Sequence, residues 1–227
     1  MKNNLTEIAY ILDRSGSMQP MQEAAVAAFN QFVKSQLDVP GDARLSLIQF
    51  DNVYEIPISM REIREVPELT AQTFTPRGST ALLDAIGRTI KETDKRIEAT
   101  PEARQPGKVI VAIFTDGMEN ASTEYSAKHI ADLIQLYREQ KGWDFLFLAA
   151  NQDAMASGEA MKMDQNLTGN VAFDEKGLRS SSQAMSRKVR AIRMRSAGVM
   201  DAQAVADDAK PLEQIVREEE AEADESE

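Results

Sequence analysis

The sequence predicts an α/β fold of the Rossmann-like, doubly wound type, with a mostly parallel sheet, one antiparallel edge hairpin and helices on both faces. Three features of the 227-residue chain predict it. Apolar runs at 8–12, 109–114 and 143–150 are typical of buried parallel strands. Segments with helical spacing of apolar residues separate these runs. Finally, residues 44–50 and 53–58 look like strands joined by only two residues, which predicts an antiparallel hairpin and therefore a sheet edge.

The helices are predicted from apolar residues that recur every three or four positions. The helices expected on this basis cover about 18–37, 82–97, 130–137, 153–163 and 178–196. Residues 169–173 are expected to form a short edge strand. The apolar stripe of the last helix is expected to pack on the sheet, with its arginines facing solvent or the acidic C-terminal segment.

Oxygen-bearing side chains follow two of the predicted buried strands. Asp13, Ser15 and Ser17 alternate in a tight turn after the first strand, and Asp116 follows a later one. Ligands of doubly wound sheets bind at the carboxyl ends of the strands. Thr80, at the start of the second predicted helix, can bring another hydroxyl to this edge. Carboxylate and hydroxyl oxygens suit Mg²⁺ or Mn²⁺ rather than zinc, so these residues predict one cation site.

A purely structural interpretation of the same residues is also possible. Asp13 and Ser17 would then cap the helix that begins near Met18, because short polar side chains satisfy the free amides of a first turn. That interpretation explains neither Thr80 nor Asp116.

The segments that carry these residues resemble the metal-ion-dependent adhesion site of von Willebrand factor A (VWA) domains. The resemblance comprises the Asp-x-Ser-x-Ser turn at 13–17, the Gly-Ser-Thr-x-Leu segment at 78–82 and Thr-Asp-Gly at 115–117. Their order and spacing match over roughly residues 5–150. Residues 115–125 and 147–153 are similar to small stand-alone bacterial and phage members. The resemblance implies the Rossmann-like fold and a metal-dependent protein–protein interaction module.

The resemblance also implies a role for each site residue. Ser15, Ser17 and Thr80 would bind Mg²⁺ or Mn²⁺ directly. Asp13 and Asp116 would hold the ion directly or through water. In the family, a Glu or Asp of a partner protein takes the remaining position. Neutral hydroxyl ligands suit this role because they leave the ion with positive charge for the incoming carboxylate.

Four residues near the predicted metal face are candidates for contact with a partner protein. Arg14 and Met18 flank the metal loop. Asn151 and Asp153 follow the strand at 143–150, where a turn and a helix N-cap explain them equally well. The identity of the partner does not follow from the sequence.

The net charge of −11 is concentrated near the C-terminus. Residues 199–227 hold 11 acidic residues against Lys210 and Arg217. The last ten residues lack apolar periodicity, which predicts disorder or a frayed helix end. We therefore expect a domain at 1–198, with its core at about 5–150 and helices to about 196, followed by an acidic, disordered tail at 199–227. The tail can aid solubility, occupy the metal site or screen the preceding basic helix.

Two other function classes are open. The basic stretch at 179–195 could bind nucleic acid, although no aromatic residues interleave with its arginines. A metal-dependent hydrolase or phosphotransferase could use the same cation, but Ser15 stands where a haloacid-type phosphatase needs a second Asp. No nucleotide-binding P-loop and no Cys–His or Ser–His–Asp set is evident. The sequence favours a binding module over an enzyme.

The chain has no cysteine, which excludes disulfides and thiolate metal sites. No apolar run approaches the roughly 20 residues that span a bilayer. The N-terminus leads straight into the first strand without a signal-peptide pattern. These features predict a cytoplasmic protein.

Overall fold

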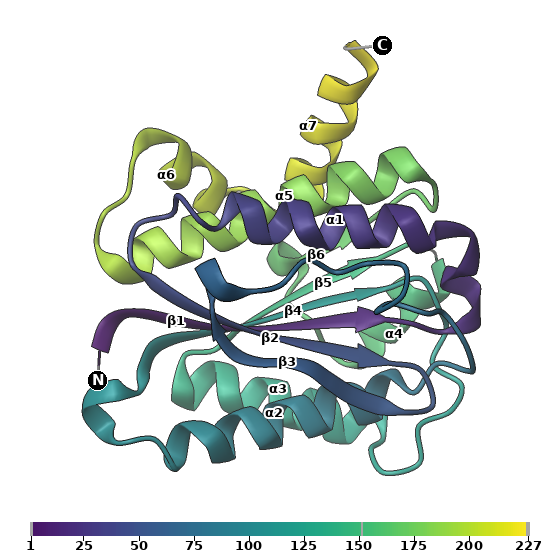
Figure 1. The fold of residues 1–227 in the computed structure, drawn as a ribbon, viewed down its shortest axis with the longest axis horizontal. Helices are drawn as coiled ribbons and strands as arrows, with labels where there is room; N and C mark the ends of the chain where they lie inside the picture. The colour runs from purple at the N-terminus through teal and green to yellow at the C-terminus, as the bar shows by residue number, and fades with distance from the viewer. Residues whose placement is uncertain (1, 151, 226–227) are drawn as a thin grey trace.

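A six-stranded sheet in the order β3-β2-β1-β4-β5-β6 forms the centre of the computed structural model, which describes residues 2–150 and 152–225 (Figure 1). Within it, only β2 and β3 pair antiparallel. The predicted mostly parallel sheet with one edge hairpin is therefore confirmed. The strands are β1 (Lys2–Asp13), β2 (Asp42–Phe50), β3 (Tyr54–Glu62), β4 (Pro106–Thr115), β5 (Asp144–Ala149) and β6 (Thr168–Asn170).

Helices cover both faces of the sheet, as the doubly wound prediction requires. Helices α1 and α5 lie on one face, and α2 and α3 lie on the other (Figure 1). The helix predicted to reach Met163 ends at Ala160, and Lys162 then adopts the left-handed φ of +52°. The α-helices are α1 (Gln22–Ser35), α2 (Leu82–Glu98), α3 (Ala127–Lys141), α4 (Gln152–Ala160), α5 (Glu175–Ala197), α6 (Ala202–Ala209) and α7 (Leu212–Glu225).

The central strand β1 is apolar on both faces because both faces are covered. Ile8, Tyr10 and Leu12 face the layer that contains α1 and α5, whereas Ala9 and Ile11 face α2 and α3. The alternation follows from the two-residue period of a strand. Burial of each large aliphatic side chain stabilises the fold by roughly 1.5–3 kcal/mol, so these two cores hold β1 firmly in the middle of the sheet.

The segment after residue 198 forms helices α6 and α7, so the predicted disorder is wrong over 202–225. Of the two alternatives for the last ten residues, the helix end is the one that residues 218–225 match. Leu212, Ile215 and Val216 of α7 are fully buried in the core that also contains α5. They recur at i, i+3 and i+4, a short apolar stripe on an otherwise acidic helix. The packed unit therefore extends beyond the predicted boundary at 198.

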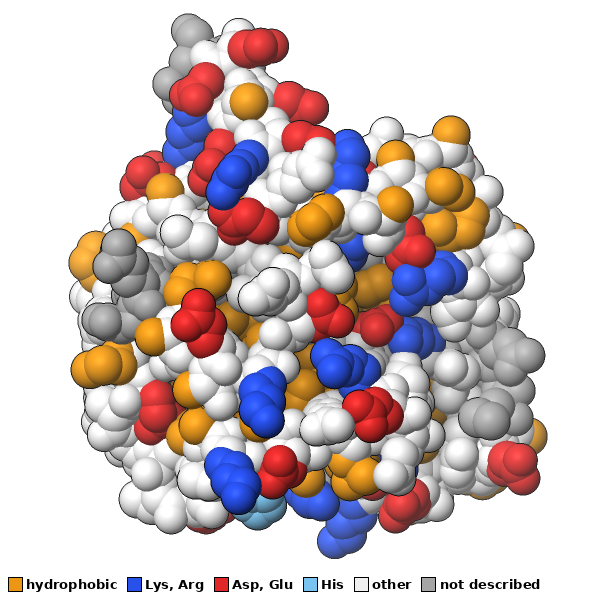
Figure 2. All heavy atoms as spheres, turned by 180° about the vertical axis from the view of Figure 1, so that it is seen from behind, with side chains coloured by type: hydrophobic (Ala, Val, Ile, Leu, Met, Phe, Trp, Pro, Cys, Tyr) orange, Lys and Arg blue, Asp and Glu red, His pale blue; other side chains and the backbone are white. Residues whose placement is uncertain are grey.

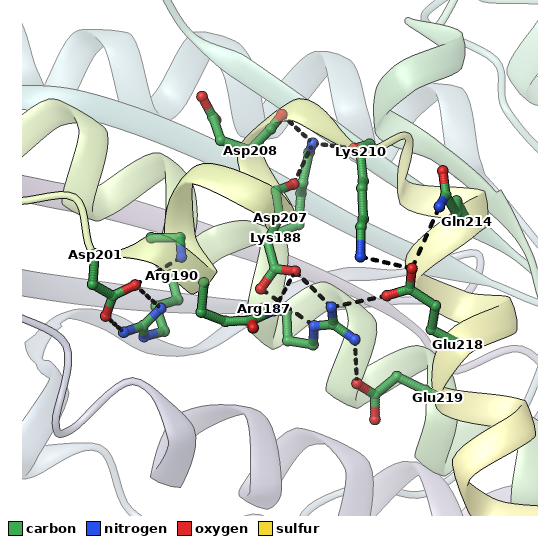
Figure 3. Close-up of polar contacts among 12 residues, drawn as sticks. Arg187, Lys188, Arg190, Asp201, Asp207, Asp208, Lys210, Gln214, Glu218 and Glu219 are labelled. Carbon is green, nitrogen blue, oxygen red and sulfur yellow. Dashed lines mark hydrogen bonds and ion pairs between the residues drawn. The ribbon is translucent and has the colours of Figure 1, made fainter.

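Ion pairs between α5 and the last two helices reinforce this packing (Figure 3). Arg187 donates to Asp207 at 2.5 Å, to Glu218 at 3.0 Å and to Glu219 at 2.8 Å. Lys188 donates to backbone carbonyls at the C-terminal end of α6, where a cation also complements the helix dipole. Of the roles expected for the tail, screening of the basic helix is the one that these contacts match.

Three further basic side chains of α5 also have partners within the chain. Arg190 pairs with Asp201, and Arg195 pairs with Asp208 at 2.6 Å. Arg193 is buried and donates to backbone carbonyls that follow α1. On the face seen in Figure 2, basic and acidic side chains are interspersed rather than gathered into one basic patch. Arg187, Arg190 and Arg195 are thus neutralised by acidic side chains of the same chain, which weakens the nucleic-acid alternative.

Membrane-spanning helices are not found among residues 2–150 and 152–225, where every helix is either too short or too polar to cross a bilayer.

Candidate metal centre

The turn after β1 is built around the buried carboxylate of Asp13. One oxygen, Oδ1, accepts a hydrogen bond from the backbone N–H of Ser15 at 2.7 Å. The other, Oδ2, accepts one from the hydroxyl of Thr115 at 2.5 Å. The hydroxyls of Ser15 and Ser17 lie 3.0 Å apart. The Asp13 side chain therefore fixes the turn, and the turn places two hydroxyls side by side.

Helix capping does not explain this turn. The chain enters a short 3₁₀ helix at Gly16–Met21, and within the described residues its N-cap, Ser15, makes no side-chain capping bond. Asp13 instead binds the amide of Ser15, which precedes that helix. The geometry therefore favours the metal interpretation of these side chains over the capping one.

Asp116 reaches the same turn because β4 pairs in parallel with β1 and both strands end at one edge of the sheet. Burial raises the pKa of the Asp116 carboxyl, against which a hydrogen bond from Ser17 acts, and the charge of Asp116 adds to the burial that raises the pKa of Asp13. The hydrogen bond from Thr115, the residue before Asp116, to Asp13 fixes the two strand ends beside each other.

Thr80 completes the group from the other side. A Cβ atom added to Gly117 would lie only 2.8 Å from the Thr80 hydroxyl oxygen. Glycine at 117 therefore leaves room for the Thr80 side chain directly beside Asp116. The structure thus brings together Asp13, Ser15, Ser17, Thr80 and Asp116, the five residues that the sequence predicts for one site.

Burial makes the two carboxylates costly as anions. The pKa of Asp13 is raised to about 7, mainly by burial, and the nearby charge of Asp116 contributes further. Burial also raises the pKa of Asp116, an effect that the Ser17 hydrogen bond partly offsets. A cation beside both groups would relieve their desolvation and their mutual repulsion.

The donor set fits a hard divalent cation. Two carboxylates and three hydroxyls offer oxygen ligands only, as Mg²⁺ and Mn²⁺ prefer. Among the residues that the structure describes, no three His, Cys, Asp or Glu side chains converge into a metal-binding cluster. A cation at this edge of the sheet would therefore depend on the hydroxyls of Ser15, Ser17 and Thr80.

The loop after Asp116 is fastened to the start of α2 by two carboxylates. Glu119 accepts from the amide of Leu83 at 2.9 Å and from the amide of Ser122 at 2.7 Å. Asp84 accepts from three consecutive amides of the loop at 2.9 Å each, those of Thr123, Glu124 and Tyr125. These contacts explain structurally why the 115–125 segment, which begins at the end of β4, contains Glu119 and packs against the start of α2.

Thr80 is held by the backbone and side chain of Asn120. The Thr80 amide donates to Asn120 Oδ1 at 2.9 Å, and the Asn120 amide donates to the Thr80 carbonyl at 3.0 Å. The N-cap of α2 is Ala81, and Glu119 and the Ser122 hydroxyl accept from the amides of Leu83 and Asp84, so the Thr80 hydroxyl is not needed as a cap. Sequence reasoning missed these functions of Glu119 and Asn120, although both belong to the family-like 115–125 segment.

Two of the predicted partner contacts are not supported. Arg14 is only 5% exposed and pairs with Asp51 at 3.1 Å and with Glu55 at 2.7 Å. Met18 is fully buried in the core between β1 and α1. Sequence position alone placed both beside the metal loop, but their side chains point into the protein.

The other two predicted contacts stay predictions. Asn151 lies outside the described residues. Asp153 lies in the first turn of α4, and the structure does not describe its side chain. Met118, which is 54% exposed and follows Asp116 by two positions, is a surface residue that sequence reasoning did not select.

The sequence model of the von Willebrand factor type A domain matches residues 8–119, the stretch that contains all five site residues. Residues 8–119 belong to the von Willebrand factor type A family. Solved structures agree with this VWA assignment at the level of the fold. No curated protein matches the sequence.

Three solved structures illustrate the likeness of this VWA chain. Proximal thread matrix protein 1 from the mussel byssus is 14% identical, with a TM-score of 0.55 over 82% of this chain and 46% of that one. The von Willebrand factor type A protein from Catenulispora acidiphila is 16% identical, with a TM-score of 0.52 over 82% of this chain and 42% of that one. The manganese-loaded TRAP protein of Plasmodium vivax is 15% identical, with a TM-score of 0.53 over 77% and 71%. The chain thus spans less than half of the first two proteins.

Proposed function

We propose that this VWA domain is a protein–protein interaction module that depends on Mg²⁺ or Mn²⁺. The observation that carries the proposal is the convergence of two buried carboxylates and three hydroxyl residues at the carboxyl edge of the sheet. The manganese-loaded TRAP protein of Plasmodium vivax, which shares the fold, gives further support.

In this proposal Ser15, Ser17 and Thr80 hold the cation directly, and Asp13 and Asp116 hold it directly or through water. When bound, the cation supplies positive charge that attracts a carboxylate of the partner protein. The hydrogen bonds from Ser15 and Thr115 keep the Asp13 carboxylate in one orientation before binding. The neutral hydroxyls leave charge for a Glu or Asp from the partner. Binding is preferred to hydrolysis because Ser15 occupies the place of the acid that a haloacid-type phosphatase requires.

The metal is tested by thermal unfolding of the full chain with and without Mg²⁺ or Mn²⁺. At a hundredfold excess over the dissociation constant, binding should stabilise the folded state by ~2.7 kcal/mol. Asp13→Ala and Asp116→Ala should lose this stabilisation. Asp38→Ala, which removes an exposed carboxylate after α1, should keep it. Equal stabilisation of the wild type and both site variants would refute the assignment.

The partner chemistry is tested by NMR titration with a short peptide that carries one Glu between small residues. The titration uses Mg²⁺ because it is diamagnetic. With the peptide in excess, the amide signals of residues near Ser17 and Thr80 should shift. The same peptide with Gln in place of Glu, or the chelator EDTA, should abolish the effect. Thr80→Ala should weaken it with a stability loss of only about 1 kcal/mol. Binding that persists in EDTA would point to a different surface.

A further inference from the structure

A ring of four charged side chains lies beside the candidate metal centre. Arg14 belongs to the metal turn, Asp51 follows β2, Glu55 lies on β3, and Arg77 precedes Thr80 in its loop. Asp51 is fully buried and Arg14 is 5% exposed, whereas about half of the Arg77 side chain is exposed. Each of these residues therefore comes from a different segment of the chain.

The ring is closed by ion pairs at short distances. Asp51 Oδ2 accepts from Arg14 Nε at 3.1 Å and from Arg77 Nε at 3.0 Å. The two oxygens of Glu55 accept from Arg14 at 2.7 Å and from Arg77 at 3.0 Å. The hydrogen bond from Arg14 lowers the pKa of Glu55, which keeps that carboxyl ionised. Two positive charges are thus balanced by two negative ones.

Backbone hydrogen bonds join the same segments. The amide of Arg77 donates to the carbonyl of Arg14 at 2.8 Å, and the amide of Gly16 donates to the carbonyl of Gly78 at 3.1 Å. The amide of Ala81 donates to the carbonyl of Asp51 at 3.0 Å. Asp51 therefore contacts the chain on both sides of Thr80, and its partner Arg14 lies between Asp13 and Ser15.

We propose that Asp51, with Arg14 and Arg77, positions the metal ligands by fixing the 13–17 turn against the loop that carries Thr80. This inference rests on the metal site of the proposed function. Asp51 does not touch the metal in this scheme; it acts through the two arginines and through Ala81.

Two physical arguments support a positioning function. Buried ion pairs contribute little net stability, because desolvation of the charges offsets their attraction, so the ring is better explained by the geometry that it imposes. In addition, two guanidinium groups close to a divalent cation would repel it. Asp51 and Glu55 neutralise them and so keep the surroundings of the site compatible with a cation.

The test measures Mn²⁺ affinity of the full chain by electron paramagnetic resonance titration. Asp51→Asn keeps the size of the side chain but removes the charge that both arginines bind. It should weaken Mn²⁺ binding by roughly tenfold or more, as is typical when a residue that orients metal ligands is lost. Arg77→Gln should also weaken binding. Arg88→Gln, which breaks the exposed pair with Glu124, is the matched control and should bind Mn²⁺ as the wild type does.

The outcomes separate this inference from the proposal on which it rests. If the wild type binds no Mn²⁺, the metal site and the positioning function fail together. If the wild type binds and folded Asp51→Asn binds equally well, only the positioning function is overturned, even if that variant melts at a lower temperature. If Asp51→Asn fails to fold, the Mn²⁺ affinity of Arg77→Gln decides, because the Arg77 side chain is half exposed. Wild-type affinity of that variant then overturns the inference.

Discussion

Glu7 in β1 allows the stability of the fold to be tested against pH. Its side chain is 1% exposed, and its Oε2 has no hydrogen-bond partner among the described residues. Ser46 donates to Oε1 at 3.3 Å, and the charges of Arg96 and Arg44 act on the carboxyl from α2 and β2. Burial outweighs these favourable contacts and raises the pKa of Glu7 from 4.5 to about 7.

The sign and size of the effect follow from this pKa. Because folded Glu7 holds its proton more tightly than the unfolded chain does, its contribution to stability is complete below about pH 4.5 and is lost as the pH rises to about 7. Each pKa unit corresponds to about 1.36 kcal/mol, so the loss is roughly 3 kcal/mol. Glu7→Gln keeps the shape of the neutral acid and has no charge to bury. At pH 8 this variant should therefore be more stable than the wild type by up to roughly 3 kcal/mol.

Urea unfolding of both proteins from pH 4.5 to pH 8 measures the effect. The difference between them should be small at the acidic end and should grow with pH, while contributions from other titrating groups, such as Asp13, cancel. Glu68→Gln removes an exposed carboxylate and serves as the control, with a small difference at every pH. A stability difference for Glu7→Gln that is constant over this range would refute the reasoning.

Three further predictions concern the C-terminal helices and the site. Ile215→Ala should reduce the free energy of unfolding by roughly 2–5 kcal/mol, because a fully buried side chain is removed; exposed Glu222→Ala should have little effect, and equal stabilities would mean that α7 does not pack on the core. Arg187→Ala should lower the free energy of unfolding by about 3 kcal/mol, because it leaves the buried carboxylate of Asp207, whose side chain is 1% exposed, without this cation. An equal loss for the exposed Arg217→Ala, measured by urea unfolding, would contradict this prediction. Gly117→Ala should push the Thr80 hydroxyl away and weaken Mn²⁺ binding by roughly tenfold, because its Cβ would lie 2.8 Å from that oxygen. Met118→Ala should keep wild-type Mn²⁺ affinity, and an unchanged Gly117→Ala affinity would place Thr80 outside the metal shell.

The sequence by itself determined the sheet, its edge hairpin and the five candidate ligands. Apolar runs such as 8–12 and 109–114 have a local cause, since strands covered on both faces contain few polar residues. Asp13 directly follows the first run and Asp116 comes two residues after the end of the second, so parallel pairing of β1 with β4 brings them to one edge. The alternation of strands and helices along the chain was sufficient to predict this part of the fold, because a parallel sheet is built by repeating a strand–helix unit.

Only the tertiary structure decided which side chains meet across distant segments. Arg14 is adjacent to two predicted ligands, yet it turns inward because Asp51, 37 positions later, offers a buried carboxylate. The acidic composition at 199–227 predicted disorder, but three apolar residues of α7 pack on α5, and Arg187 binds the neighbouring acids. Charge and composition describe a segment alone, whereas desolvation, ion pairing and packing depend on what the rest of the chain places against it.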